Sequence, residues 1–361
     1  MATGTRQFMT GNDAIGEGAI RAGCECYYGY PITPQNELTA YMAANMPRHG
    51  RVFLQAESEL AAINMVFGSS VAGKRAMTSS SSPGISLKQE GISYLAGAEL
   101  PAVIVNVQRG GPGLGNIAPS QADYFQAVKG GGHGDYHQVV LAPCSVQEMH
   151  DLAYEAFDLA DRYRTPVMVL ADGILGQMME PLHLRDPRPP DRHEKPWALT
   201  GAEGRAPRMI RSLYLGDGEL EALNLRLQKR YREIRRTEVR VEEIGTDQCD
   251  ILIVAYGTCA RIAKGAMEEG RDDGLKLGLL RPVTLWPFPA ARLRELAAGK
   301  QAILVIEMSS GQMLEDVQLA VAERAPVCFQ GRMGGAVPGV REILGAVEAI
   351  RDGKARPVTW Q

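Results

Sequence analysis

The sequence lacks the features that mark several large classes of protein. Aromatic residues make up only 6% of its 361 positions. No apolar run approaches the roughly 20 residues of a membrane span, and the first residues lack the apolar core of a signal peptide. The formal net charge of -3 creates no field that would favour nucleic acid or a membrane surface. We therefore expect a cytoplasmic protein that binds neither nucleic acid nor membrane.

The chain also lacks a cluster of metal-binding cysteines. Of its six cysteines, only Cys24 and Cys26 are close in sequence. A C-x-C pair with no further ligand nearby fits neither a zinc site nor an iron–sulfur motif. We therefore predict no metal site in this chain and interpret the cysteines as small buried residues.

Glycine, by contrast, is abundant, and apolar strands alternate with amphipathic helices. The forty glycines suit the tight strand-to-helix turns of a doubly wound α/β fold. The pattern predicts helices that include 11–21 and 146–162, and strands at 26–28, 52–54, 76–79, 102–107, 138–141 and 167–170. We interpret 52–54 as the end of a buried strand. The order indicates a parallel sheet covered by helices on both faces.

The composition changes after this region. Residues 183–208 are rich in proline and charge, residues 219–240 read as a charged helix, and a second strand–helix alternation begins near Cys249. The sequence therefore predicts a doubly wound domain, a linker with a charged helical arm, and a smaller α/β domain, with boundaries at 1–182, 183–247 and 248–361.

Three glycine-rich segments come close to known motifs without matching them. Residues 68–74 have P-loop spacing, but Arg75 stands where a serine or threonine would bind magnesium. Residues 113–118 resemble G-x-G-x-x-A but follow their strand only after five further residues. Residues 216–218 lack the asparagine that a magnesium–diphosphate motif needs. A nucleotide-binding dehydrogenase is therefore the weaker alternative, and a noncatalytic scaffold is a third.

Polar side chains gather just after the predicted strands. Glu59 stands at a strand-to-helix junction, where Ser58 is the expected helix cap. Complementing the helix dipole is the alternative role of this carboxylate. The carboxyl ends of parallel strands meet at one edge of a sheet. We therefore expect Glu59 to lie at the same edge as residues 30–34, 78–82, 109–115 and 130–133.

These segments resemble the alpha subunit of the 2-oxoacid:ferredoxin oxidoreductases, most closely the branched-chain (3-methyl-2-oxobutanoate) branch. Residues 29–34, 55–59 and 79–87 read as family signatures, and 281–283 and 287–289 match more loosely. The resemblance implies a pyrimidine-type thiamine-diphosphate-binding domain followed by a smaller domain like the C-terminal domain of transketolase. It also implies a shared cofactor, with the pyrimidine held by this chain and the diphosphate and Mg²⁺ held by a beta subunit.

The same resemblance implies roles for individual residues. Glu59 is the implied catalytic residue, which hydrogen-bonds the pyrimidine nitrogen N1′, with Glu57 as second candidate. Residues that correspond to the family's cofactor-binding positions are Tyr30, Pro31, Ile32, Glu59 and Ser81. Residues expected to bind the substrate are Thr33, Arg109 and, as a pocket polar group, His133.

The implied reaction is oxidative decarboxylation of a 2-oxoacid to an acyl-coenzyme A and carbon dioxide. Coenzyme A is the cosubstrate, 4Fe–4S clusters belong to partner chains, and ferredoxin takes the electrons. Expected partners are the beta subunit, a gamma subunit and a ferredoxin-like delta subunit. The loop 110–117 contains Leu114 and Ile117 but no cation, and Lys88 and Lys129 fall on predicted helices, where they can face elsewhere. This favours a branched-chain substrate, with 2-oxoglutarate as the alternative.

Overall fold

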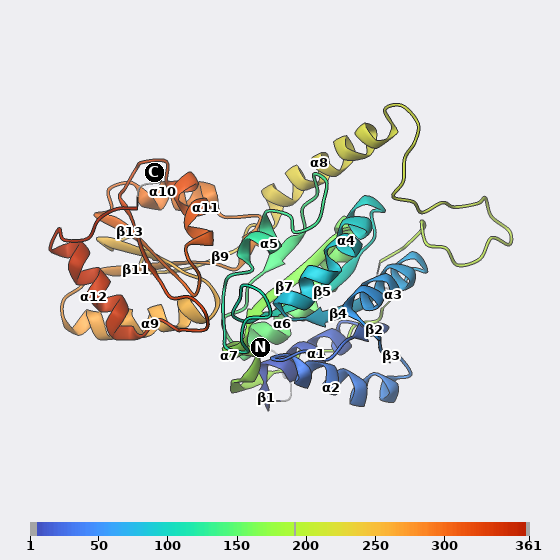
Figure 1. Ribbon diagram of the computed structural model, residues 1–361, viewed down its shortest axis with the longest axis horizontal. Helices are drawn as coiled ribbons and strands as arrows, with labels where there is room; N and C mark the ends of the chain where they lie inside the picture. The colour runs from blue at the N-terminus through green and yellow to red at the C-terminus, as the bar shows by residue number, and fades with distance from the viewer. Residues whose placement is uncertain (1–5, 191–192, 359–361) are drawn as a thin grey trace.

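The computed structural model describes residues 6–190 and 193–358, which form two α/β units (Figure 1). The first contains a seven-stranded sheet of order β12-β6-β7-β5-β4-β2-β3. All neighbours in this sheet are parallel except β12 and β6. Its strands are β2 (Cys26–Gly29), β3 (Val52–Gln55), β4 (Ala76–Ser80), β5 (Ala102–Gln108), β6 (Val139–Leu141), β7 (Pro166–Asp172) and β12 (Thr284–Trp286).

Helices cover this sheet, with α1 packed against α6 and α3 packed against α4 (Figure 1). A short antiparallel pair, β1 (Arg6–Thr10) and β8 (Met179–His183), lies beside them. The arrangement confirms the doubly wound domain expected from the sequence. Its helices are α1 (Gly11–Arg21), α2 (Asn36–Asn45), α3 (Glu59–Val71), α4 (Ser82–Gly97), α5 (Tyr124–Val128), α6 (Val146–Tyr163) and α7 (Gly173–Gln177), with the 3-10 turn η1 (Pro47–His49).

The second unit is built on a five-stranded sheet of order β14-β13-β10-β11-β9, in which only β9 runs antiparallel to its neighbour. Its strands are β9 (Val241–Ile244), β10 (Ile251–Val254), β11 (Leu277–Pro282), β13 (Ala302–Glu307) and β14 (Val327–Gly331). Its helices are α9 (Gly257–Asp272), α10 (Ala290–Ala297), α11 (Gln312–Val321) and α12 (Val340–Arg351). Among the residues described, no helix is both long and apolar enough to cross a membrane.

The two units are joined by strand pairing and buried polar contacts. Strand β12 belongs to the second half of the chain but extends the first sheet. The hydroxyl of Thr258, at the start of α9, donates to the buried carboxylate of Asp172 at 2.8 Å. Arg281 of β11 pairs with Glu148 of α6 at 2.6 Å. The smaller unit is therefore anchored to the carboxyl end of β7.

The expectation of a buried strand at 52–54 is wrong in one respect. A strand is present, but Val52 is 47% exposed and Leu54 is 41% exposed. Strand β3 is the last strand of the sheet and, among the described residues, pairs only with β2, so it lies at an exposed edge. The short apolar run is typical of a buried strand, and only the strand order shows that it is an edge.

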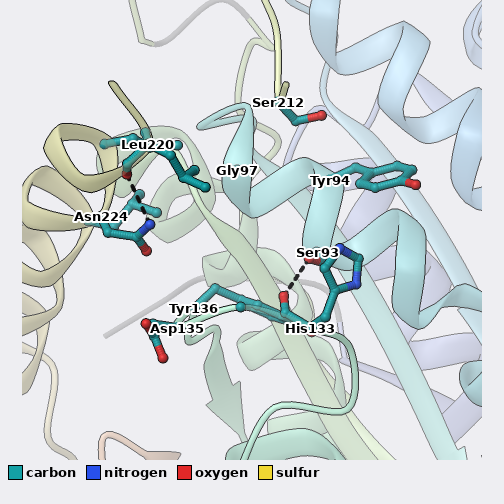
Figure 2. Close-up of a pocket in the computed structure, with 12 residues that line it drawn as sticks. Ser93, Tyr94, Gly97, His133, Asp135, Tyr136, Ser212, Leu220 and Asn224 are labelled. Carbon is teal, nitrogen blue, oxygen red and sulfur yellow. Dashed lines mark hydrogen bonds between the residues drawn. The ribbon is translucent and has the colours of Figure 1, made fainter. Parts of the chain in front are cut away.

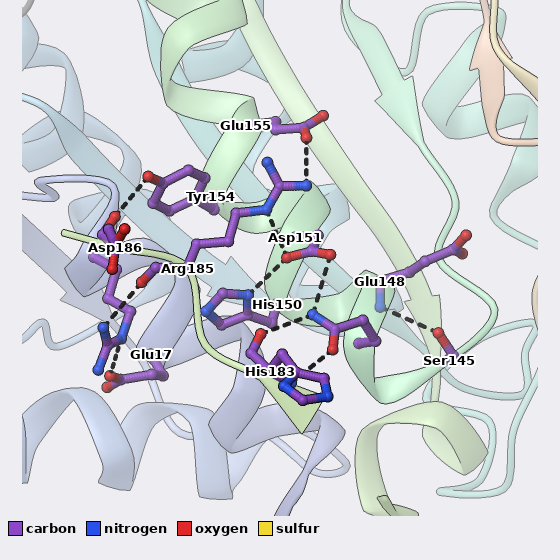
Figure 3. Close-up of polar contacts among 12 residues, drawn as sticks. Glu17, Ser145, Glu148, His150, Asp151, Tyr154, Glu155, His183, Arg185 and Asp186 are labelled. Carbon is purple, nitrogen blue, oxygen red and sulfur yellow. Dashed lines mark hydrogen bonds and ion pairs between the residues drawn. The ribbon is translucent and has the colours of Figure 1, made fainter. Parts of the chain in front are cut away.

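The first part of the expected linker is attached to α6 (Figure 3). Arg185 pairs with Asp151 at 2.8 Å and with Glu155 at 2.9 Å. The hydroxyl of Tyr154 donates to the carbonyl of Asp186 at 2.7 Å. The contacts continue along the chain, since Lys195 pairs with Asp161 at 3.0 Å and the Leu199 N–H donates to the Val71 carbonyl at 2.9 Å. Beyond them the chain extends away from the body and returns as α8 (Glu219–Thr237) (Figure 1).

Arg75, which stands at the end of the P-loop-like segment, has a structural role. It is buried and pairs with Asp158 at 2.6 Å and Asp161 at 2.8 Å, both on α6. The preceding residues belong to α3 and its C-terminal turn. This segment therefore connects α3 to the core and forms no phosphate-binding loop.

Candidate functional site

Glu59 begins α3 at the carboxyl edge of the first sheet. The Ser58 backbone is extended, and its hydroxyl accepts a hydrogen bond from the Ala61 N–H at 3.1 Å, as an N-cap does. Glu59 is only 6% exposed, whereas Glu57 is exposed. No side chain in the described part of the chain hydrogen-bonds to the Glu59 carboxylate. The carboxylate oxygens are therefore free to accept hydrogen bonds from a ligand.

The serine-rich turn between β4 and α4 lies directly against this carboxylate. The hydroxyls of Ser80 and Ser81 are buried and have no hydrogen-bond partner within residues 6–190 and 193–358. A Cβ atom on Gly84 would lie 2.0 Å from the Ser80 Oγ and 2.6 Å from Glu59 Oε1. The backbone of α4 therefore approaches Glu59 so closely that only glycine fits. Orphan hydroxyls beside a buried carboxylate suit a polar ligand such as an aminopyrimidine.

Ser82 links this turn to the end of β5. Its hydroxyl accepts from the Arg109 N–H at 3.0 Å and donates to the Asp123 carboxylate at 2.7 Å. The Asn106 amide also donates to Asp123, at 2.9 Å. Burial raises the pKa of Asp123, while both hydrogen bonds act in the opposite direction. The start of α4 is thus fixed to the strand that carries Arg109.

Arg109 and Thr33 are brought together across the edge of the sheet. The Arg109 guanidinium donates to the carbonyl of Thr33 and to that of Leu114, each at 3.0 Å. Its Nε is buried and has no partner among the described residues. The residue is only 7% exposed, so it is no surface arginine. An unpaired guanidinium N–H at the end of β5 is suited to an anionic ligand.

The other residues predicted to bind the cofactor lie on two segments of this edge. Tyr30 and Pro31 are exposed, and Ile32 is half-buried, on the loop that carries Thr33. Ser81 is buried in the turn beside Glu59. Their contacts with a cofactor stay a prediction.

His133 lies beside Ser93 and Tyr94, in the second half of α4 (Figure 2). Its carbonyl accepts from the Ser93 hydroxyl at 2.7 Å, and its ring stands edge-on to Tyr94. Ser93 is nine residues beyond Gly84 on α4, which is roughly 13 Å along the helix axis. The imidazole lines a cavity of about 220 Å³ that α8 also borders. The structure thus does not bring His133 together with Glu59.

Sequence reasoning missed the position of one cation. The expectation that Lys88 can face elsewhere is wrong, because Lys88 is fully buried and its Nζ lies 3.4 Å from the Glu59 carbonyl oxygen. The signal was available in the spacing of Gly84 and Lys88, since residues four apart share a helix face. Lys129, by contrast, is bound to Asp316 at 2.5 Å.

The segment 113–118 does not form a dinucleotide-binding turn. Residues 111–117 are an exposed loop, and α5 begins only at Tyr124. The loop is held by the Arg109 contact to Leu114, so its glycines serve a turn beside the site. The dehydrogenase alternative therefore has no structural support.

Family models match both units of the chain. Residues 17–226 match the thiamine diphosphate-binding domain of pyruvate flavodoxin/ferredoxin oxidoreductase, and residues 249–343 match core domain II of pyruvate:ferredoxin oxidoreductase. The ketoisovalerate oxidoreductase subunit VorB of Methanothermobacter marburgensis is 53% identical over 344 residues, which cover 95% of this chain and 97% of the relative. The chain belongs to the 2-oxoacid:ferredoxin oxidoreductase family. The 2-oxoglutarate synthase subunit KorA of Methanothermobacter thermautotrophicus is 38% identical, over 94% of this chain and 97% of its own length.

Solved structures agree with this assignment. The 2-oxoglutarate:ferredoxin oxidoreductase from Magnetococcus marinus, solved with 2-oxoglutarate, coenzyme A and succinyl-CoA bound, has a TM-score of 0.87 and 28% identity. The match covers 96% of this chain and 65% of that chain. A split-gene transketolase shares the fold, with a TM-score of 0.57 and 13% identity. The relatives of comparable length are named as subunits, so this 2-oxoacid:ferredoxin oxidoreductase chain is one subunit of a hetero-oligomer.

Proposed function

We propose that this protein is the pyrimidine-binding subunit of a branched-chain 2-oxoacid:ferredoxin oxidoreductase. The enzyme converts a 2-oxoacid and coenzyme A into an acyl-coenzyme A and carbon dioxide, and passes two electrons to ferredoxin. The observation that carries the proposal is the buried Glu59, whose carboxylate has no hydrogen-bond partner among the described residues, at the carboxyl edge of a thiamine-diphosphate-binding domain.

Thiamine diphosphate, when bound, supplies the nucleophilic carbon that attacks the 2-oxo carbon of the substrate. The residues present suit its aminopyrimidine ring. Glu59 is the proposed partner of N1′ and holds a proton there, which is the task of a general acid–base group. Ser81 and the loop of Tyr30, Pro31 and Ile32 are the proposed walls of the ring site.

Replacing Glu59 with glutamine tests this role directly. The amide keeps the size of the side chain but cannot exchange a proton with N1′. We expect Glu59→Gln to lower hydrogen–deuterium exchange at the thiazolium C2 by at least about 100-fold, within the range of general acid–base contributions. The assay is NMR of quenched samples of the assembled complex. Glu57→Gln is the matched control. Because Glu57 is exposed, this substitution should leave the exchange rate unchanged. Wild-type exchange in Glu59→Gln would refute the proposal.

Arg109 and Thr33 are the proposed holders of the substrate carboxylate. The Arg109 Nε, which has no partner within residues 6–190 and 193–358, supports this role, as does the contact that fixes its guanidinium to the Thr33 loop. The Thr33 hydroxyl accepts from Asn36 at 3.2 Å and keeps its own hydrogen for the ligand. His133 contacts Ser93, which lies roughly 13 Å along α4 from Gly84, so we do not propose it as a neighbour of Arg109 at the substrate.

The proposed substrate is 3-methyl-2-oxobutanoate, with 2-oxoglutarate as the alternative. A second substrate carboxylate requires a further buried cation. Two lysines are candidates for that cation. Lys129 is paired with Asp316, and Lys88 is buried and bonds to the Glu59 carbonyl oxygen. The 53% identity to a ketoisovalerate oxidoreductase subunit, against 38% to a 2-oxoglutarate synthase subunit, supports the same choice.

A side-by-side assay decides between the two substrates. With a viologen acceptor and saturating coenzyme A, we expect a higher kcat/KM for 3-methyl-2-oxobutanoate than for 2-oxoglutarate, by about 10-fold or more. Pyruvate serves as the reference that lacks both the branch and the second carboxylate. A larger kcat/KM for 2-oxoglutarate would reverse the assignment.

The proposed complex contains further chains. A beta subunit would supply the Mg²⁺ and diphosphate site, and partner chains would carry the 4Fe–4S clusters. A gamma subunit and a ferredoxin-like delta subunit are the other proposed partners. We also propose the boundaries 1–182, 183–247 and 248–361 as the functional division of this chain, with strand β9 of the middle segment pairing into the sheet of the smaller unit.

A further inference from the structure

Lys88 is a buried cation that the proposed chemistry does not yet use. It is fully buried on α4, and its Nζ makes one hydrogen bond with the described residues, to the Glu59 carbonyl oxygen at 3.4 Å. Gly84, one turn earlier on the same helix face, lies against the Glu59 carboxylate. Side chains of a helix lean toward its N-terminus, so the Lys88 ammonium reaches back toward Glu59.

We propose that Lys88 is a positioning residue that acts through Glu59. Its hydrogen bond to the Glu59 carbonyl oxygen fixes the first turn of α3 and holds a positive charge beside Glu59. The inference rests on the proposed role of Glu59. Lys88 thereby sets the pH range in which Glu59 and the pyrimidine nitrogen share a proton.

The other charged side chains on the elements around Lys88 and Glu59 are few and are bonded elsewhere. Strands β2, β4 and β5 pack against α3 and contain no Asp, Glu, Lys or Arg. The other charged residue of α4, Glu90, is exposed and bonded to the Tyr94 hydroxyl at 2.5 Å. Asp172, at the end of β7, is bonded to Thr258 and to the first turn of α7.

The tyrosines on the neighbouring strand are also engaged elsewhere. The Tyr27 hydroxyl contacts Thr39 and Ser79, and the Tyr28 hydroxyl contacts Ser69. Burial raises the pKa of Tyr27 to about 12, so it stays neutral in the relevant range. Of the lysines, acids and tyrosines on these elements, Lys88 is the one with a hydrogen bond to Glu59.

Burial also brings the titration of Lys88 into the working range of an enzyme. Desolvation lowers the pKa of Lys88 to about 8, and the charge of Glu59 acts in the opposite direction. Lys88 is thus charged at neutral pH and loses its proton just above it. Its effect on Glu59 is present below about pH 8 and disappears above it.

The test is circular dichroism of the assembled holo-complex, which reports the imino tautomer of the bound pyrimidine as a function of pH. Lys88→Met removes the charge at nearly constant volume. Without the cation the shared proton is held more tightly, so we expect the tautomer midpoint to rise by about one pH unit or more. Lys88→Arg should restore the midpoint. The KM for the 2-oxoacid should stay within about twofold, because the proposed carboxylate site is at Arg109 and Thr33, whereas Lys88 bonds to the Glu59 backbone.

Two controls separate the possible outcomes. Lys74→Met removes an exposed lysine that pairs with Glu25, and its midpoint should match the wild type. If Lys88→Met does not assemble, Lys88→Gln replaces it, and its tautomer midpoint should rise in the same way. An unchanged midpoint in a folded Lys88 variant overturns the inference while a defective Glu59→Gln still supports the proposed function. Wild-type behaviour of Glu59→Gln overturns both.

Discussion

Arg109→Lys is the substitution that best tests how the substrate carboxylate is held. The guanidinium donates to the carbonyls of Thr33 and Leu114 at the same time, and its Nε has no partner in the part of the chain that the structure describes. A lysine ammonium is a point charge on a flexible stem and cannot reproduce this planar set of donors. The substitution therefore keeps the charge but removes the geometry.

The magnitude follows from the hydrogen bonds that are lost. A hydrogen bond to a charged group contributes about 1.5–3 kcal/mol. Losing one of the two proposed contacts with the carboxylate should therefore lower kcat/KM by roughly 10 to 150-fold, since about 1.4 kcal/mol corresponds to a factor of ten. Loosening of the loop that contains Leu114 adds to this loss rather than opposing it.

The assay is steady-state reduction of a viologen by the complex with 3-methyl-2-oxobutanoate. Hydrogen–deuterium exchange at the thiazolium C2, measured without substrate, should remain near the wild-type rate because Glu59 is untouched. Arg211→Lys is the control, since Arg211 forms an exposed pair with Glu219. Arg109→Lys kinetics equal to those of the wild type would refute the role of the guanidinium, and loss of C2 exchange would show a collapsed site instead.

Two further predictions concern the chain itself. The purified subunit should contain no stoichiometric iron by metal analysis, because its cysteines are buried and no cluster of metal-binding side chains occurs among the described residues; a bound cluster would contradict the assignment of iron to partner chains. Burial lowers the pKa of His137 from 6.5 to about 4, so the unfolded chain binds more protons between these values. Stability to thermal unfolding should therefore fall as pH drops from about 6.5 toward 4. His137→Gln should lose less stability than the wild type over that range. Equal pH dependence of the two proteins would exclude His137 as the cause.

Local sequence patterns predicted most of the fold of the first unit. Alternating apolar strands and helices gave the doubly wound sheet, and Ser58 correctly indicated the start of α3. These features depend on residues close in sequence, such as a cap and the N–H groups one turn later. The exposed edge strand β3 and the late strand β12, which extends the first sheet, depend on pairing between distant segments, which local periodicity does not encode.

For the site, the sequence by itself determined which side chains follow the strands and therefore that Glu59, Thr33 and Arg109 belong to one edge of the sheet. Only the tertiary structure decided how they meet: Arg109 is bound to the Thr33 carbonyl, Gly84 lies against Glu59, and His133 lies elsewhere. The tertiary structure also decided that the Lys88 ammonium lies beside the Glu59 carbonyl oxygen. The reason is that helix rotation and helix packing fix the direction of each side chain, and these depend on the whole core rather than on neighbouring residues.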